Sequence, residues 1–120
     1  MFGLPKDFNA DRLVGRTLEM ICFNENQIYF HFDEKLTIEV VGSLGHQRWP
    51  AQEPEIVEVP VLQSNLMQLL GHSTTKAFGD DKGTLTLEFE DGQILQYLGD
   101  TPMYECYHII QGDHRIIVYE

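Results

Sequence analysis

Residue types that often carry out chemistry are present in this sequence, but none stands in a recognised catalytic spacing. Five histidines, two cysteines and many carboxylates are scattered over 120 residues. The chain contains no Cys-x-x-Cys, His-Glu-x-x-His or calcium-loop pattern, and no Gly-x-Ser-x-Gly nucleophile turn. The sequence therefore predicts no metal site, no cofactor and no catalytic residue, and it favours a non-enzymatic function over an enzymatic one.

Two short segments contain residues that are typical of binding surfaces. Arg48 and Trp49 stand in a proline-bounded segment, and side chains of these two types dominate the energetics of protein interfaces. Tyr104, Glu105 and His108 form an aromatic and charged group before the last predicted hairpin. We predict these five residues as candidate binding residues. The structural alternatives stay open: Trp49 covers the open end of the core, and the tyrosine is half-buried.

The charge balance restricts the partners that this chain can bind. The 19 Asp and Glu residues exceed the 8 Lys and Arg residues, which gives a formal net charge of −11. The excess is spread over both halves of the chain rather than gathered in a tail. Such a surface repels nucleic acid and anionic lipid and accelerates encounter with basic partners. We therefore expect a protein partner, with a basic one favoured, and no nucleic acid and no membrane. A charge that serves only solubility is the alternative.

The cysteine pattern and the chain ends suggest a reduced, cytoplasmic setting. Cys22 and Cys106 are too few for a disulfide framework, and both lie in apolar strand-like runs that favour buried, unreactive thiols. No basic N-terminal region is followed by a long apolar stretch, and no apolar run approaches the ~18 residues that span a bilayer. We therefore expect a cytoplasmic location.

Alternation of apolar and polar residues predicts strands along most of the chain. Asp91-Gly92 is the strongest hairpin signal. The proline-containing segment 43–54 is predicted to be a loop, and Pro60 indicates that the strand 55–62 lies at a sheet edge or ends there. The other predicted strands cover 18–23, 27–32, 36–41, 74–78, 84–89, 94–98, 104–110 and 115–119.

The two halves of the sequence resemble each other. NADRLVG at 9–15 parallels NLMQLLG at 65–71, and each segment predicts a short capped helix closed by glycine. The apolar positions at 28, 30 and 32 likewise parallel those at 85, 87 and 89. The pattern predicts two tandem helix-β-β-β repeats, approximately 9–42 and 65–99, and a C-terminal hairpin at 104–119, within a single domain of residues 1–120. A chance match between strand patterns is the alternative.

Repeats of this size cannot cover their own apolar faces, so they must pack together. The predicted fold is therefore mainly β: an antiparallel β sandwich or partly open barrel with one or two short helices. The central core is predicted to contain the inward residues Ile28, Phe30, Phe32, Leu85, Leu87 and Phe89.

Several segments together resemble a family of small uncharacterised bacterial proteins, similar to the immunity-type proteins of toxin systems. These segments are Leu-Val-Gly-Arg-Thr at 13–17, residues 28–32, Gly-Thr-Leu-Thr-Leu-Glu-Phe-Glu-Asp-Gly at 83–92, Tyr-Glu-Cys-Tyr at 104–107 and Arg-Ile-Ile-Val at 115–118. The resemblance implies a bacterial, cytoplasmic, non-enzymatic protein and no catalytic residues to transfer.

Three functional hypotheses follow from these observations. The leading one is a non-enzymatic acidic protein-binding module, an immunity-like inhibitor of a basic partner. The second is a small-ligand-binding or enzymatic β domain, with a pocket between the repeats that contains His31, His108 or Glu105. The third is a structural homo-oligomer, in which exposed strand edges such as residues 55–62 pair across a two-fold axis.

Overall fold

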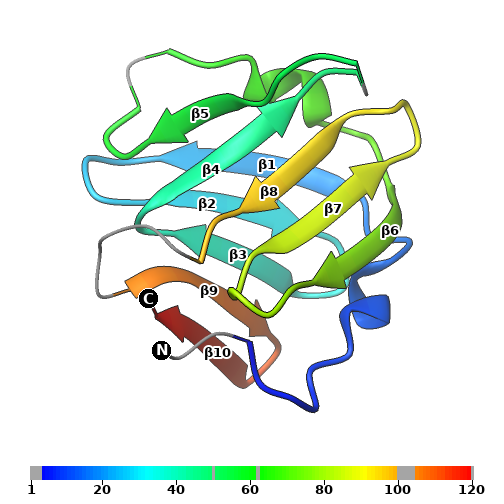
Figure 1. The fold of residues 1–120 in the computed structure, drawn as a ribbon, viewed down its shortest axis with the longest axis vertical. Coiled ribbons are helices and arrows are strands. Elements are labelled where there is room, and N and C mark those ends of the chain that lie inside the picture. The colour runs from blue at the N-terminus through cyan, green and yellow to red at the C-terminus, as the bar shows by residue number, and fades with distance from the viewer. Residues whose placement is uncertain (1–3, 50, 62, 100–104, 120) are drawn as a thin grey trace.

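Two antiparallel five-stranded sheets pack against each other in the computed structural model, which describes residues 4–49, 51–61, 63–99 and 105–119 (Figure 1). Their strand orders are β1-β2-β3-β9-β10 and β5-β4-β8-β7-β6, so the predicted mainly-β sandwich is confirmed and no barrel closes. The elements in chain order are η1 (Ala10–Leu13), β1 (Leu18–Phe23), β2 (Ile28–Phe32), β3 (Leu36–Val40), β4 (Ser43–Gln47), β5 (Glu55–Glu58), η2 (Leu66–Leu69), β6 (Thr74–Gly79), β7 (Leu85–Phe89), β8 (Ile94–Tyr97), β9 (Glu105–Gln111) and β10 (His114–Tyr119), where η denotes a 3₁₀ helix.

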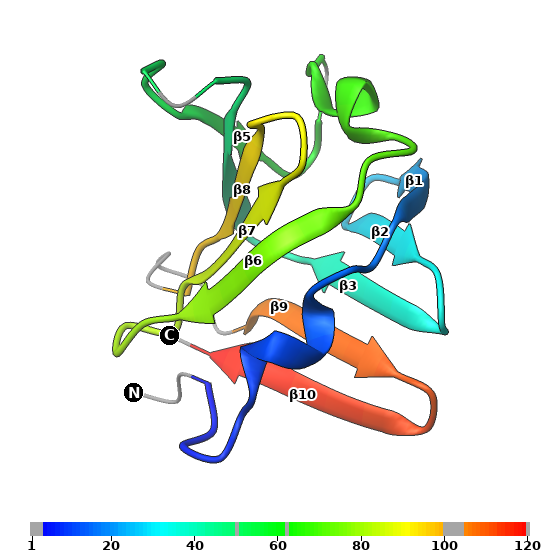
Figure 2. The same ribbon diagram turned by 90° about the vertical axis from the view of Figure 1, so that its right-hand side faces the viewer.

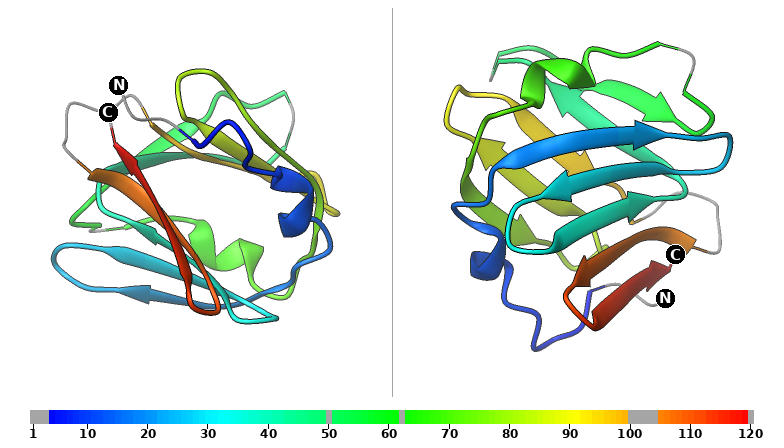
Figure 3. Two further views of the ribbon diagram at one scale, coloured as in Figure 1. Left: turned by 90° about the horizontal axis from the view of Figure 1, so that it is seen from below. Right: turned by 180° about the vertical axis from the view of Figure 1, so that it is seen from behind.

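The two halves of the chain exchange their last two strands. Each half runs through one 3₁₀ helix and five strands, but only its first three strands stay in its own sheet. The hairpin β4–β5 joins β8 of the second half, and β9–β10 joins β3 of the first, as Figure 3 (right) shows for the orange and red strands beside the blue ones. The two junctions match, because Leu44 pairs with Tyr97 and Tyr107 pairs with Val40. The repeat is therefore longer than predicted, since the C-terminal hairpin has a counterpart in the first half.

A pseudo-two-fold axis passes between Thr17 and Ser73, which are 56 positions apart and form an antiparallel bridge. Their hydroxyl oxygens lie 2.6 Å apart. Equivalent backbone bonds flank the axis, since Leu18 N donates to His72 O and Thr74 N donates to Arg16 O, both at 3.0 Å. The equality of these bonds shows that the repeat seen in the sequence is also a repeat of backbone structure.

The predicted loop at 43–54 is wrong in its first part, because Ser43–Gln47 forms strand β4 between β5 and β8. This strand is buried on both faces along most of its length, so it does not show the alternation of a half-exposed strand. The predicted strand 55–62 is shorter than expected and ends at Glu58, but it does lie at a sheet edge, as Pro60 indicated.

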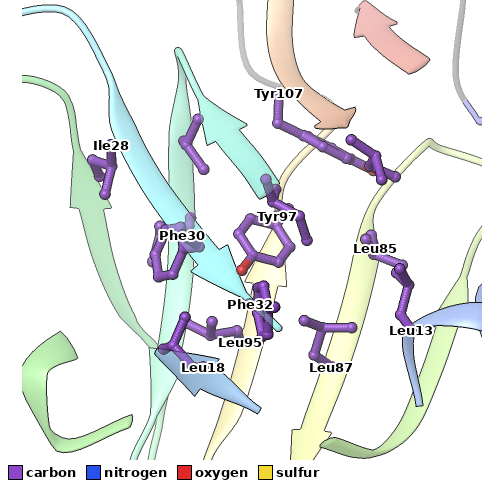
Figure 4. Packing of buried hydrophobic residues seen from close by; sticks show 14 of the residues in the cluster. Leu13, Leu18, Ile28, Phe30, Phe32, Leu85, Leu87, Leu95, Tyr97 and Tyr107 are labelled. Carbon is purple, nitrogen blue, oxygen red and sulfur yellow. The ribbon is translucent and has the colours of Figure 1, made fainter. Parts of the chain in front are cut away.

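The core lies between the sheets and contains all six of the predicted inward residues, each at most 4% exposed. Phe30 packs edge-to-face on Tyr97, with ring centroids 5.4 Å apart (Figure 4). The Tyr107 hydroxyl donates to Gly83 O, whereas the buried Tyr97 hydroxyl has no hydrogen-bond partner among the described residues. Burial raises the pKa of Tyr97 well above its ordinary value, so this phenol stays neutral in the core.

Candidate functional site

Arg48 and Trp49 follow directly after β4 and lie on the surface. The guanidinium carbon of Arg48 is 5.2 Å from the centre of the Trp49 ring, a cation–π distance. Trp49 is 52% exposed, so the alternative in which it covers the open end of the core is wrong. The pair is a small preformed aromatic and cationic surface on the second sheet.

His46 lies close to this pair in the sequence but is a buried residue of β4. Its Nε2 is 2.9 Å from the side-chain oxygen of Gln93, whose amide nitrogen donates to Asp91 Oδ2 at 2.6 Å and to the Gln68 carbonyl at 2.9 Å. Because that nitrogen has two acceptors, the oxygen faces the imidazole and His46 Nε2 is the donor. Burial lowers the pKa of His46, which keeps it neutral. These hydrogen bonds connect helix η2 to the second sheet.

His108 belongs to a polar cluster on the outer face of the first sheet. Its Nδ1 lies 2.7 Å from an Arg115 nitrogen and 3.6 Å from Glu39 Oε1, and Arg115 lies 3.4 Å from the same carboxylate oxygen. A guanidinium can only donate, so His108 Nδ1 accepts from Arg115. The imidazole and the carboxylate are both buried, whereas Arg115 is half-exposed. The cluster joins three neighbouring strands, β3, β9 and β10.

The structure does not bring the predicted site residues together. Tyr104 lies outside the described residues, as does the side chain of Glu105, the first residue of β9. Arg48 and Trp49 follow β4 of the second sheet, whereas His108 lies on β9 of the first. Figure 1 shows the end of β4 at the top of the molecule and β9 near the bottom. The predicted pocket between the repeats does not contain His31 or His108, since both face outward from the first sheet; His31 Nδ1 contacts the Thr37 hydroxyl at 3.0 Å.

A surface groove that the sequence analysis missed lies between strand β1 and helix η2. Its volume is about 480 Å³. Three large apolar side chains in it are unusually exposed: Phe23 at 50%, Met67 at 68% and Leu70 at 42%. We call this feature the β1 groove; its lining consists of Ile21, Phe23, Val61, Gln63, Ser64, Met67 and Leu70.

The pseudo-two-fold symmetry provides an internal comparison for the β1 groove. A second groove, of about 420 Å³, lies between η1 and β6 in the other half. The equivalents of Met67 and Ile21 there are Asp11 and Ala77. The equivalent of Phe23 is Gly79, against which Leu4 of the N-terminal arm packs. The second groove therefore forms with a polar residue in place of Met67, so the fold does not require that exposed side chain. Leu4 and Val14, by contrast, provide apolar side chains at the places of Phe23 and Leu70.

The segments that form the β1 groove contain acidic but no basic residues. Residues 17–34 and 49–75 hold no Lys or Arg at all. Their carboxylates are Glu19, Glu25, Asp33, Glu34, Glu53, Glu55 and Glu58. The groove is thus an apolar depression formed by segments in which no Lys or Arg compensates the acidic residues.

One signal in the sequence could have revealed the groove. Residues 66–70, Leu-Met-Gln-Leu-Leu, are apolar at four of five positions, but a single helical turn can bury only one side. Leu66 and Leu69 are fully buried, which leaves Met67 and Leu70 on the outside. The proximity of Phe23, which is more than 40 residues away in the chain, depends on the tertiary fold.

Within the described ranges, no group of three or more His, Cys, Asp or Glu residues is placed to hold a metal ion. In the same ranges, no helix has the length and apolar character needed to cross a membrane. No protein-family model, curated protein or solved structure matches this chain.

Proposed function

We propose that this chain is a non-enzymatic protein-binding module that inhibits a basic partner protein in the manner of an immunity protein. The β1 groove is the observation that supports it, because an exposed apolar depression in segments whose Asp and Glu residues have no Lys or Arg beside them in sequence matches a basic partner with an apolar contact surface. Met67 is not needed by the fold, as its counterpart Asp11 shows.

The charge of the whole molecule supports the same class of partner. A net charge of −11 steers a basic protein toward this chain and repels nucleic acid and anionic membranes. The setting that we propose is the bacterial cytoplasm, where the thiols of Cys22 and Cys106 stay reduced. Cys106 is fully buried as predicted, whereas Cys22 is only partly buried.

The proposal is tested by capture of the partner and measurement of its affinity. The purified chain is immobilised, exposed to host lysate at low and high salt, and the retained proteins are identified by mass spectrometry. We expect one basic protein that is retained at low salt and lost at high salt. Salt screens the attraction between exposed charges that are more than about 10 Å apart at 0.1 M. The purified partner then loses its own activity when the chain is added in stoichiometric amount.

Lysozyme, an unrelated basic protein, is the specificity control. Equal affinity for lysozyme and for the captured protein would show that the chain is only a general polyanion. Retention of no protein at either salt concentration would contradict the proposed function.

A further inference from the structure

The outer edge of β1 is the least protected strand edge of the described sandwich. The edge strands of the two sheets are β1, β10, β5 and β6. Native sheets protect such edges with charged residues or proline. β6 carries Lys76, β10 carries Arg115, and Pro54 and Pro60 flank β5. β1 has no Lys, Arg or proline, and its one charged residue, Glu19, lies at the bulge between Leu18 and Met20. From Met20 to Phe23 the strand carries no charge and its pairing with β2 is regular.

The β1 groove lies directly beside this edge. Ile21 and Phe23 pair with the core residues Phe30 and Ile28, so they point toward the inner side of the sheet, where the groove begins. Figure 3 (right) shows the green helix η2 next to the blue strand β1, on the side away from β2. Every second residue of an edge strand directs its backbone N–H and C=O outward. The outward groups of Leu18 pair with Gly71 and His72. Beyond Leu18, backbone groups of β1 that have no partner among the described residues lie beside the apolar groove.

Building on the proposed function, we infer that the β1 groove binds an extended segment of the basic partner, which adds to the first sheet as a sixth strand alongside β1. Alternate side chains of the added strand point the same way as Ile21 and Phe23, so its apolar residues contact Met67 and Leu70. Its remaining side chains are Lys or Arg, because the two segments that form the groove contain only acidic charges. A second copy of this chain is disfavoured as the occupant, because two molecules of net charge −11 repel each other.

The test uses a displayed library of random peptides of about twelve residues, long enough for one strand. The library is selected on the wild-type chain and counter-selected on Met67→Asp. This variant places at position 67 the residue that the fold already accepts at the equivalent position, Asp11. We expect enriched peptides that alternate apolar residues with Lys or Arg, and that bind Met67→Asp at least about tenfold more weakly than the wild type.

The matched control is Ile56→Asp, since Ile56 is a similarly exposed apolar residue (56%) on β5, outside the groove lining. It should bind the selected peptides with wild-type affinity. Thermal unfolding of both variants checks that neither loses its fold.

Two measurements establish strand addition as the mode of binding. Amide hydrogen exchange should slow at residues 20–23 when peptide is bound, because outward N–H groups of β1 become hydrogen-bonded. N-methylation of alternate peptide residues should abolish binding in one register and leave it intact in the other, because only one edge of the added strand faces β1.

The outcomes separate this inference from the proposed function. Basic peptides whose salt-sensitive binding is unchanged by Met67→Asp, or which slow amide exchange in another strand, would overturn strand addition at β1. The proposed function, an acidic protein-binding module, would still stand. Enrichment of acidic or salt-insensitive peptides would overturn both proposals. A doubled mass in solution, together with slow exchange at residues 20–23 before any peptide is added, would identify a second copy of the chain as the occupant and overturn the inference. A selection that enriches no peptide would also overturn it.

Discussion

His46 and Gln93 are buried polar residues at positions where the other half of the molecule is apolar. His46 pairs with Leu95 on β8, and its counterpart Ile109 pairs with Ile38 on β3. Gln93 likewise corresponds to Leu36, which is 1% exposed. A hydrogen-bonded pair and an apolar pair thus fill the same place in the two halves. The polar pair has one additional contact, the bond from Gln93 to the Gln68 carbonyl in η2.

A double-mutant cycle measures this difference. His46→Ile alone leaves the Gln93 oxygen without its buried partner and should lower the free energy of unfolding by about 1–3 kcal/mol. His46→Ile combined with Gln93→Leu reproduces the apolar pair of the other half, so it should cost less than the sum of the two single changes. Urea unfolding at neutral pH gives all four values. Strict additivity would contradict the coupling.

The buried imidazole also predicts a pH dependence. Burial holds the pKa of His46 below its ordinary value of 6.5, while the Gln93 hydrogen bond and the nearby Glu55 charge partly oppose this shift. Below pH 6.5 the unfolded chain binds a proton at this position and the folded chain does not. Stability from His46 is therefore complete above pH 6.5 and falls as the pH drops from there toward the lowered folded pKa.

The measurement is urea unfolding between about pH 8 and about pH 5 for the wild type and for His46→Gln. The wild type should lose more stability than the variant over the acidic part of this range. Parallel curves would show that the pKa of His46 is the same in the folded and unfolded chains.

At the scale of elements, two glycines form matching turns between helix and strand. Gly15 and Gly71 follow η1 and η2 with φ of +82° and +84°, and each donates its N–H to the strand of the other half at 2.8 Å. No atom outside the neighbouring residues lies within 4 Å of a Cβ built at either position. A side chain there meets open space, so the cost of substitution is purely that of the backbone conformation.

Gly15→Ala and Gly71→Ala should therefore each destabilise the protein by about 1–2 kcal/mol, the cost of a left-handed conformation for an L-residue. Asparagine tolerates this conformation better, so Gly15→Asn and Gly71→Asn should cost less than the alanine variants. Thermal unfolding of the four variants provides the comparison. Equal losses for alanine and asparagine would point to a steric cause instead.

Elements with strict alternation were predictable, and those without it were not. β2 and β7 alternate cleanly, and the Asp91-Gly92 turn fixes the hairpin after β7. β4 was missed because Ser43–Gln47 contains glycine and a buried histidine, and because most of it is buried on both faces. Because β4 was not predicted, the equivalence of the hairpins β4–β5 and β9–β10 could not be inferred from the sequence.

The candidate site was less predictable than the fold, because it depends on edges rather than on periodicity. Ile21 and Phe23 point inward because the bulge between Leu18 and Met20 shifts the alternation, and the sequence shows neither this bulge nor that β1 ends its sheet. An inward residue on an edge strand meets the side opening of the sandwich rather than its centre, and Phe23 is therefore half-exposed. Residue type did identify Arg48 and Trp49 as a surface pair, although their role in binding is still a prediction.

At the scale of the whole molecule, the exchanged hairpins make each half depend on the other. Strand β4 of the first half pairs with β8 of the second half, and β9 of the second half pairs with β3 of the first. Residues 1–62 and 63–120, produced as separate chains, should therefore lack cooperative unfolding on their own and regain it when mixed in equal amounts. Circular dichroism during urea titration detects the difference. A half that unfolds cooperatively as a monomer would contradict this dependence.

The same exchange determines when the protein can fold during its synthesis. The hairpin β4–β5 leaves the ribosome long before β8, the strand that it joins, and β3 waits for β9 at the end of the chain. Domains usually fold from the N-terminus as they emerge, but here each sheet needs strands from the second half. A nascent chain that stops before β9 presents the unpaired edge of β3, which favours aggregation. Emergence of β9 and β10 is thus the step that completes the first sheet.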